Sequence, residues 1–315
     1  MNGTGEPQQL VERWRTFWFK PEPAYPLGLV RMAFGALVVL WTLSLYPDLH
    51  DFFGTAGIAP HQSGDTWGVF AIWPGSAALS IGWAVLLIAA VMLTVGWHSR
   101  LAAFLVFVLV VSFERRTSFV FNAGDGLIRI EALFLMVSSC GAALSLDRRR
   151  VGKPFWSAES QAPWAVRLMQ VQLSLIYVSS VLLKMTGDAW PHGTAVSYAL
   201  RLDDMLILPA PQWLSTDALL MNLATWATLA LELAIGVLVW RRRLTPWLLG
   251  AGVAMHGTIM IGINVGFFTP AMFVLYLAFV PPERVRRIPH VRNAIGTWLR
   301  VELRRRRAAF VRPGH

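Results

Sequence analysis

The amino-acid sequence predicts an all-α fold, a polytopic helical bundle embedded in a membrane with about eight spans, in a range of six to eight. Of the 315 residues 55% are hydrophobic and only 15% are charged, whereas soluble domains carry nearer a quarter charged residues. Apolar stretches of about 20 residues, enough to cross a hydrocarbon layer of roughly 30 Å, recur along the chain. Basic connections alternate with acidic ones. Helices are the expected form, because backbone polar groups in lipid need internal partners.

The apolar stretches follow one another with mostly short connections. The third is the weakest, because its uninterrupted apolar part is only LAAFLVFVLVVSF. The last is short and either tilted or re-entrant. The predicted spans lie near 27–45, 77–96, 99–116, 127–145, 164–186, 218–240, 244–263 and 267–281.

The positions of the positive charges predict the orientation. With eight spans, all but six of the 28 Lys and Arg fall on one side of the membrane. The opposite side holds the loop 46–75, which has no Lys or Arg, and the acidic loop 187–217. Cytoplasmic segments carry an excess of Lys and Arg, so the basic side and both termini are predicted to be cytoplasmic. The net charge of +10 therefore reflects topology and does not indicate a nucleic-acid-binding face.

These boundaries divide the chain into three parts. We expect a cytoplasmic N-terminal tail over 1–19, a transmembrane domain over 20–285 and a basic cytoplasmic tail over 286–315. The basic tail either lies along anionic lipid headgroups or is solvated. The N-terminus has no apolar core with a cleavage site, so no cleaved signal peptide is expected.

The sequence lacks the motifs of several classes of enzyme and metal protein, which argues against these classes. The single cysteine, Cys140, leaves no disulfide framework or metal-thiolate site. The histidines of the long outer loop, His50 and His61, do not form a metal motif with its aspartates, so no metal is expected. There is no phosphate-binding glycine loop, no nucleophile elbow and no HExxH.

Six cations fall outside the basic side, and charges in a bilayer usually face a polar interior or a water-filled cavity. Arg31 opens the first span near the cytoplasmic interface, where snorkelling explains it. Most of the others lie toward the outer side, several of them within FERRTSFVFNAGDGLIRIEALF. The six are Arg31, Arg115, Arg116, Arg129, Lys184 and Arg201.

The outer segment contains a candidate ion pair. Asp125 and Arg129 are four residues apart, so on a helix starting near Gly124 they share a face and could pair. Asp125 is also suited to cap that helix. The segment is either a capped, salt-bridged helix end or the polar floor of an outward-facing cavity, and the two are compatible. In the second interpretation Asn122 and the two cations Arg115 and Arg116 also contribute.

The stretch VLLKMTGDAWPHG places a lysine at the outer boundary of the fifth predicted span. Lys184 follows Pro163 by about 21 residues, or roughly 30 Å of helix. Tyr177 lies two turns earlier on approximately the same face, and Trp190 follows the turn. The plain interpretation is a snorkelling lysine beside an aromatic interfacial belt. His192 either shuttles protons or simply donates a hydrogen bond within its loop.

A second interpretation is that Lys184 acts as a general base. The chain has only three lysines, Lys20, Lys153 and Lys184, and otherwise uses arginine. Lysine can lose its proton when it is desolvated, whereas a guanidinium stays charged. A neutral lysine in a half-dry pocket can take a proton from an acidic hydroxyl.

Two further polar residues stand in apolar spans. They are Glu232 in LALELAIG and His256 in GVAMHGTIM. His256, Met260 and Asn264 recur every four residues and give one span a partly polar stripe, which interhelical hydrogen bonding explains.

The chain resembles the HTTM (horizontally transferred transmembrane) domain family, which includes the vitamin K-dependent gamma-carboxylases. The resemblance covers roughly residues 20–285. It is carried by RMAFGALVVLW, FFGTAGIAP, TSFVFNAGDGLIRIEALFL and RLMQVQLSLIYVSSVLLKMTGDAWPHGTAVSYAL. The most specific parts are the block from Tyr177 through Lys184 to Trp190, and the turn from Asn122 to Asp125. Animal carboxylases have an active-site histidine near this turn, whereas this chain reads FNAGD.

The resemblance implies Lys184 as the base that deprotonates a quinol, as the corresponding lysine of the carboxylases deprotonates vitamin K hydroquinone. It implies a vitamin K-like quinol as the cofactor. If the protein is an enzyme with an outward-facing pocket around Lys184, we expect the substrate to be bound by Tyr177, Trp190, His192, Asn122, Asp125, Arg129, Arg115 and Arg116. The expected partners are membrane lipids, a lipidic quinone and a peptide or protein substrate, in a bacterial plasma membrane. The alternative is a non-catalytic component for maturation, export or immunity of a secreted peptide, with the acidic outer loops as contact surfaces.

Overall fold

The computed structural model describes residues 5–58 and 67–288, and within them the fold is helical apart from one two-residue strand pair. Each predicted span contains one helix, so the all-α prediction is confirmed. These helices are α2 (Tyr25–Ser44), α5 (Ser76–Val95), α6 (Ser99–Arg116), α7 (Ala123–Val137), α9 (Trp164–Lys184), α12 (Ala218–Leu238), α13 (Thr245–Gly262) and α14 (Phe268–Leu277). The shorter elements are α1 (Gly5–Phe19), α3 (Leu49–Phe53), α4 (Val69–Ile72), η1 (Ser118–Val120), η2 (Cys140–Ala142), α8 (Leu146–Arg150), α10 (Ala195–Ala199) and α11 (Gln212–Thr216), with strands β1 (Glu22–Pro23) and β2 (Ser160–Gln161).

Among the described helices, four are long and apolar enough to cross a membrane: α2, α5, α9 and α12. The shorter α14 is also apolar. The predicted span 127–145 is too long, because α7 ends at Val137 and the chain then turns through η2 to Leu144, which has a φ of 51°. The number of spans remains a prediction.

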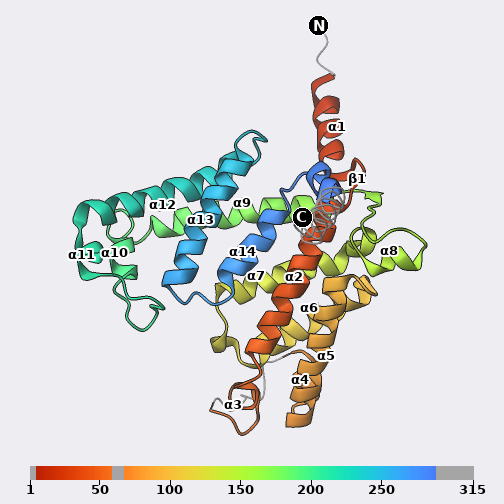
Figure 1. The fold of residues 1–315 in the computed structure, drawn as a ribbon, viewed down its shortest axis with the longest axis horizontal. Coiled ribbons are helices and arrows are strands. Elements are labelled where there is room, and N and C mark those ends of the chain that lie inside the picture. The colour runs from red at the N-terminus through yellow and green to blue at the C-terminus, as the bar shows by residue number, and fades with distance from the viewer. Residues whose placement is uncertain (1–4, 59–66, 289–315) are drawn as a thin grey trace, which may run out of the picture.

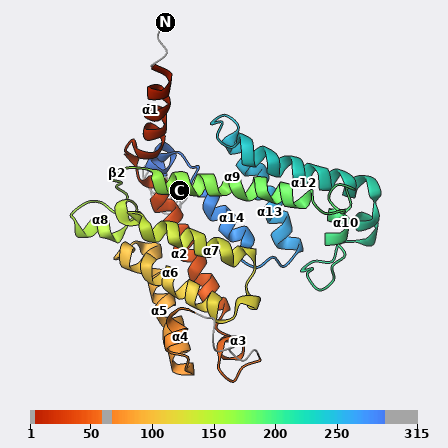
Figure 2. The ribbon, with the colours of Figure 1, turned by 180° about the vertical axis from the view of Figure 1, so that it is seen from behind.

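The connections gather at two ends of the bundle (Figures 1 and 2). We call one the basic end; it holds α1, α8, the β1–β2 pair, the turn 241–243 and the segment after α14. The opposite end holds α3, α10 and α11. The basic segments found in the sequence thus share one end of the molecule, as far as the structure describes them. The predicted tail over 286–315 lies almost wholly outside the described residues.

The helices form two groups joined by α14. In the first, α2 packs against α5, and α6 packs against both α5 and α7. In the second, α9 packs against α12, and α12 against α13. Helix α14 contacts α2 and α7 on one side and α9 and α13 on the other, and its side chains Met272 and Leu275 are fully buried. This arrangement decides which polar residues of the opposite end can meet.

Helix α8 is fastened to the start of α6 by one carboxylate. Asp147 accepts hydrogen bonds from the backbone N–H of His98 and of Ser99 at 2.8 Å, and from the Ser99 hydroxyl at 2.7 Å. It therefore satisfies N–H groups at the start of α6, which have no partner within their own helix. Partial burial raises the pKa of the Asp147 carboxyl, but the hydrogen bonds from Ser99 and His98 outweigh it, so that this pKa lies below its ordinary value.

Arg31 is fully buried, so the snorkelling interpretation is wrong. Its Nη1 donates to the carbonyl oxygens of Leu93 at 2.5 Å and Thr94 at 3.2 Å, and its Nη2 donates to that of Leu144 at 2.6 Å. The carbonyls at the end of α5 lack partners in their own helix, and the guanidinium supplies them. Gly96 ends that helix with a φ of 71°, and a Cβ there would lie 2.4 Å from Nη1 of Arg31.

Candidate functional site

Lys184 is the last residue of α9 and is held between a carboxylate and an aromatic ring. Its Nζ lies 2.5 Å from Oε1 of Glu232 on α12 and 4.4 Å from the centre of the Trp190 ring. The Lys184 side chain is 21% exposed and that of Glu232 is 8% exposed. Ser180, one turn earlier on α9, donates to the other carboxylate oxygen at 3.2 Å. The amine therefore sits in a partly closed site rather than in bulk solvent.

The packing of α9 against α12 explains this pairing. A Cβ at Gly236 would come within 2.9 Å of the Val178 side chain, so glycine allows the two helices to approach closely there. Glu232 lies one turn from Gly236 on the same face, which directs its carboxylate toward α9. On α9, Tyr177 and Lys184 are two turns apart, as the sequence predicts for residues on one face.

The loop after α9 brings Trp190 back over the amine. The chain turns through Gly193, which has a φ of 73°, and the backbone N–H of Thr194 donates to the carbonyl of Ala189 at 2.8 Å. Asn222 on α12 donates to the carbonyl of His192 at 3.3 Å. The His192 side chain is exposed, and its Nδ1 is 2.7 Å from the carbonyl oxygen of Asp188. His192 thus has a local partner, while Trp190 covers Lys184.

A buried polar trio lies deeper along the same helices. The Tyr177 hydroxyl is 2.9 Å from Nε2 of His256 on α13, and it also contacts the hydroxyl of Tyr276 on α14. All three side chains are nearly inaccessible. The other ring nitrogen of His256, Nδ1, has no hydrogen-bond partner among the described residues. The interhelical hydrogen bonding expected for His256 is present.

The second predicted group forms the start of α7. Asn122 caps this helix by accepting from the backbone N–H of Gly124 at 2.7 Å, and Asp125 accepts from the backbone N–H of Asn122 at 2.7 Å. The other oxygen of Asp125 accepts from Nε1 of Trp41 at 2.7 Å. Each oxygen of the Asp125 carboxylate therefore accepts one hydrogen bond from the protein, and the carboxylate acts as part of a capping box.

The predicted ion pair between Asp125 and Arg129 is wrong. Arg129 instead pairs with Glu114 on α6, with Nη1 and Oε2 2.6 Å apart. Neighbouring helices supply better partners for both residues, because Trp41 on α2 reaches Asp125 and α6 packs directly against α7. The Arg129 side chain remains 46% exposed.

Arg115 and Arg116 hold together the connections at the end opposite the basic end. Arg116 is buried and donates to the carbonyl oxygens of Phe53 at 2.9 Å, Phe70 at 3.0 Å and Pro74 at 3.0 Å. Arg115 lies over the Trp67 ring, 5.0 Å from its centre. The guanidinium of Arg116 thus gathers three backbone segments, a role that needs its planar set of donors.

The start of α14 lies between the two groups. The Phe268 ring is 5.7 Å from the His256 ring, and a Cβ at Gly124 would meet the backbone of Phe268 at 2.4 Å. Six of the predicted site residues therefore lie in two clusters, together with side chains that the sequence did not indicate as site residues. We call the first the lysine cluster (Tyr177, Ser180, Lys184, Trp190, Glu232, His256 and Tyr276) and the second the α7 cluster (Asn122, Asp125, Arg129 and Glu114).

Glu232 and Tyr276 were not among the candidate residues from the sequence. Glu232 had a partial signal: a carboxylate within an apolar span requires a partner, but the sequence does not indicate which cation that partner is. Tyr276 had none, because a tyrosine near the end of an apolar helix is common. Within the residues that the structure describes, no three His, Cys, Asp or Glu side chains gather in a way that could hold a metal ion.

The comparison with protein families shows to which family the chain belongs. The model of the HTTM domain matches residues 19–283, nearly the whole chain. The chain belongs to the HTTM domain family. This is a membrane domain, so the apolar helices are those of an integral membrane protein. Searches of curated proteins and of solved structures give no match for this HTTM protein.

The pairing of Lys184 with Glu232 predicts that removing one partner destabilises the protein more than removing both. We expect Glu232→Leu to lower the free energy of unfolding by about 3–5 kcal/mol, because it leaves the Lys184 ammonium partly buried and unpaired. The double variant Lys184→Met with Glu232→Leu should recover most of this loss. Unfolding in a detergent titration measures both, and equal losses in the single and double variants would contradict the pairing.

Proposed function

We propose that this HTTM protein is an enzyme of the bacterial plasma membrane that takes a proton from the acidic hydroxyl of a quinol-like lipid, with Lys184 as the general base. The observation that carries the proposal is the placement of Lys184, one-fifth exposed between the Trp190 ring and the Glu232 carboxylate. An aromatic ring and a paired amine offer a flat contact and a proton acceptor, which suit a planar aromatic substrate with a hydroxyl.

The surroundings of Lys184 suit entry of such a substrate from the lipid. Leu182 and Leu183, which precede the lysine, are 64% and 71% exposed. On α12, Leu223 and Trp226 are 59% and 44% exposed. In a membrane protein, apolar side chains without protein contacts face lipid, so a lipidic substrate approaching Lys184 would not have to cross water.

The proton transfer needs a neutral amine, and Glu232 provides a way to form one. The Lys184 ammonium passes a proton to the Glu232 carboxylate, 2.5 Å away. The neutral amine then accepts the proton of the substrate hydroxyl, which leaves an oxyanion beside the re-formed ammonium. Every proton is accounted for, and the charge that develops on the substrate is stabilised by an adjacent cation. The pair, rather than the lysine alone, is the acid–base unit.

The remaining candidate residues have more limited roles in this proposal. Tyr177 supports the lysine cluster from the buried side through His256 and Tyr276. His192 lies at the rim of the loop that carries Trp190. In the α7 cluster Arg129, half exposed, is available to an anionic part of a substrate, whereas Asn122, Asp125, Arg115 and Arg116 hold the backbone around it. We further propose that the basic end and both termini face the cytoplasm.

A photoreactive quinone tests the proposal directly. The full chain in nanodiscs is irradiated with an azido-benzoquinone in its reduced form, and the labelled peptide is identified by mass spectrometry. We expect labelling in the stretch 177–193, and competition by an unlabelled quinol. Labelling spread evenly over the lipid-facing helices, without competition, would contradict a quinol site at Lys184.

The same preparation distinguishes the non-catalytic alternative. A protein that assists maturation or export of a secreted peptide should retain that peptide during purification and show no specific quinone labelling. Its phenotype should also survive Lys184→Met, since the lysine would then be only a structural residue.

A further inference from the structure

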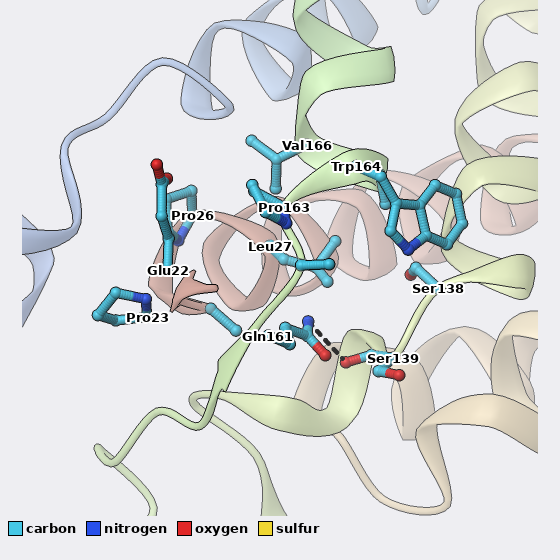
Figure 3. Close-up of a pocket in the computed structure, with 13 residues that line it drawn as sticks. Glu22, Pro23, Pro26, Leu27, Ser138, Ser139, Gln161, Pro163, Trp164 and Val166 are labelled. Carbon is cyan, nitrogen blue, oxygen red and sulfur yellow. Dashed lines mark hydrogen bonds between the residues drawn. The ribbon is translucent and has the colours of Figure 1, made fainter. Parts of the chain in front are cut away.

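The basic end contains a groove that the proposed reaction does not use. It has a volume of about 650 Å³, within the range of small-molecule sites, and lies between the start of α9, the α12–α13 turn and the segment after α14. A smaller hollow of about 230 Å³ adjoins it on the other side of the Glu22–Pro26 segment, lined by Leu27, Trp164 and Ser138 (Figure 3). We call the larger one the basic groove.

Cations from four separate segments line the basic groove. They are Lys20 after α1, Arg167 on α9, Arg242 in the α12–α13 turn and Arg284 after α14, and the lining carboxylates are Glu22 and Glu283. The four cations outnumber the two carboxylates, so the lining of the groove carries a net positive charge. The C-terminal stretch 289–315, outside the described residues, is itself rich in arginine, so its charge opposes occupation of the groove.

The guanidinium of Arg167 has an N–H group that is not hydrogen-bonded to the described part of the protein. Its Nη2 donates to Glu22 and its Nη1 to Gln170, each at 3.0 Å, and its guanidinium lies 4.9 Å from the centre of the Phe17 ring. Its Nε is buried and has no hydrogen-bond partner among the described residues. Glu22 is 42% exposed in its side chain and therefore able to move aside for an anion. The arginine is thus positioned and incompletely satisfied.

Apolar side chains form another part of the lining of the groove. Its lining includes Val166, Val239, Leu249 and Phe279. Trp240, also in the lining, is 37% exposed and donates its Nε1 to the Ser174 hydroxyl at 2.9 Å. Tryptophan with one end apolar and the other hydrogen-bonded is typical of the headgroup level of a membrane. A ligand in the groove therefore meets both cations and apolar side chains.

We propose that the basic groove binds an anionic glycerophospholipid, with its phosphate at Arg167 and Arg242 and its acyl chains over Leu249 and the exposed faces of α12 and α13. Basic pockets between transmembrane helices bind anionic headgroups in this way. On those helices Val237 is 55% and Trp247 78% exposed, so apolar surface continues from the groove to the surrounding lipid. A soluble phosphate would use the cations and leave this apolar surface uncovered.

Native mass spectrometry of the full chain tests this site. The protein in detergent is mixed with equal amounts of phosphatidylglycerol and phosphatidylcholine, with inorganic phosphate as a separate arm. We expect preferential retention of phosphatidylglycerol, lowered about fivefold by Arg242→Gln, because a cation near an anionic surface contributes about 1 kcal/mol. Arg243→Gln is the matched control, since Arg243 is the exposed neighbour that does not line the groove.

A second variant keeps the test informative should a loss of arginine disturb folding. Glu22→Gln removes the carboxylate that competes for Arg167, so it should raise retention of phosphatidylglycerol. Equal retention of both lipids, equal effects of Arg242→Gln and Arg243→Gln, or displacement of the lipid by inorganic phosphate at millimolar concentration would each overturn the proposal.

Discussion

Replacing Lys184 by arginine will lower quinol turnover by the purified protein at least about a hundredfold, since a positioned general base typically contributes 10²–10⁴ in rate. Arginine keeps the positive charge, can still pair with Glu232 and can still stack on Trp190. What it cannot do is release its proton. The substitution therefore preserves every structural role of the lysine while removing the acid–base role.

The matched control for this experiment is Lys153→Arg. Lys153 follows α8 at the basic end and is exposed, so its replacement by arginine should leave turnover unchanged. Turnover is followed as oxidation of an added benzoquinol or naphthoquinol by dissolved oxygen, which takes up the two electrons of the quinol, in proteoliposomes against protein-free vesicles. Full activity of Lys184→Arg would exclude the general-base role, and loss in both variants would indicate a general defect.

The helices of this protein were predictable because the apolar stretches are long and bounded by charge or by turn residues. The starts of α6, α9 and α12 agree with the predicted spans to the residue, and the resemblance to the HTTM family is confirmed by the match over 19–283. The exception is α7, where apolarity continues beyond the helix. Residues after Val137 are apolar because they pack under Arg31 and α8, and not because they cross the membrane in a helix.

The site was predictable only within single helices. The common face of Tyr177 and Lys184 follows from helical periodicity, and so does the capping of α7. The partners across helices do not, since sequence spacing carries no information about which helices touch. Arg129 has an acid at the right spacing on its own helix and still pairs with Glu114 on α6. Glu232 became a candidate only when the contact of α9 with α12 was known.

Arg31 raises the same difficulty in a stronger form. From the sequence, a cation at the start of an apolar span and near the basic end is expected to extend its side chain toward the membrane surface. The guanidinium instead points inward, because carbonyl oxygens at the end of α5 and at Leu144 need donors where water is excluded. The need arises from two segments far from Arg31 in sequence, so no local pattern reveals it.

We therefore expect Arg31→Met to lower the free energy of unfolding by about 3–5 kcal/mol, as for breaking a buried charged network. Methionine fills much of the volume but donates no hydrogen bond, so the carbonyls of Thr94 and Leu144 lose their side-chain donor and that of Leu93 keeps only the backbone N–H of Gly96, at 3.2 Å. Hydrogen bonds from a charged group contribute about 1.5–3 kcal/mol each, and two of these are short.

The comparison is Arg149→Met, at the same end of the molecule. Arg149 is exposed, with its guanidinium carbon 5.8 Å from the centre of the Phe155 ring, so its loss should change the free energy of unfolding by no more than about 0.5 kcal/mol. Detergent-titration unfolding measures both variants. If Arg31→Met were as mild as Arg149→Met, the buried guanidinium would not be what joins the end of α5 to Leu144, and the connection would have to rest on other contacts, such as the backbone hydrogen bond from Asp147 to the Gly96 carbonyl at 2.9 Å.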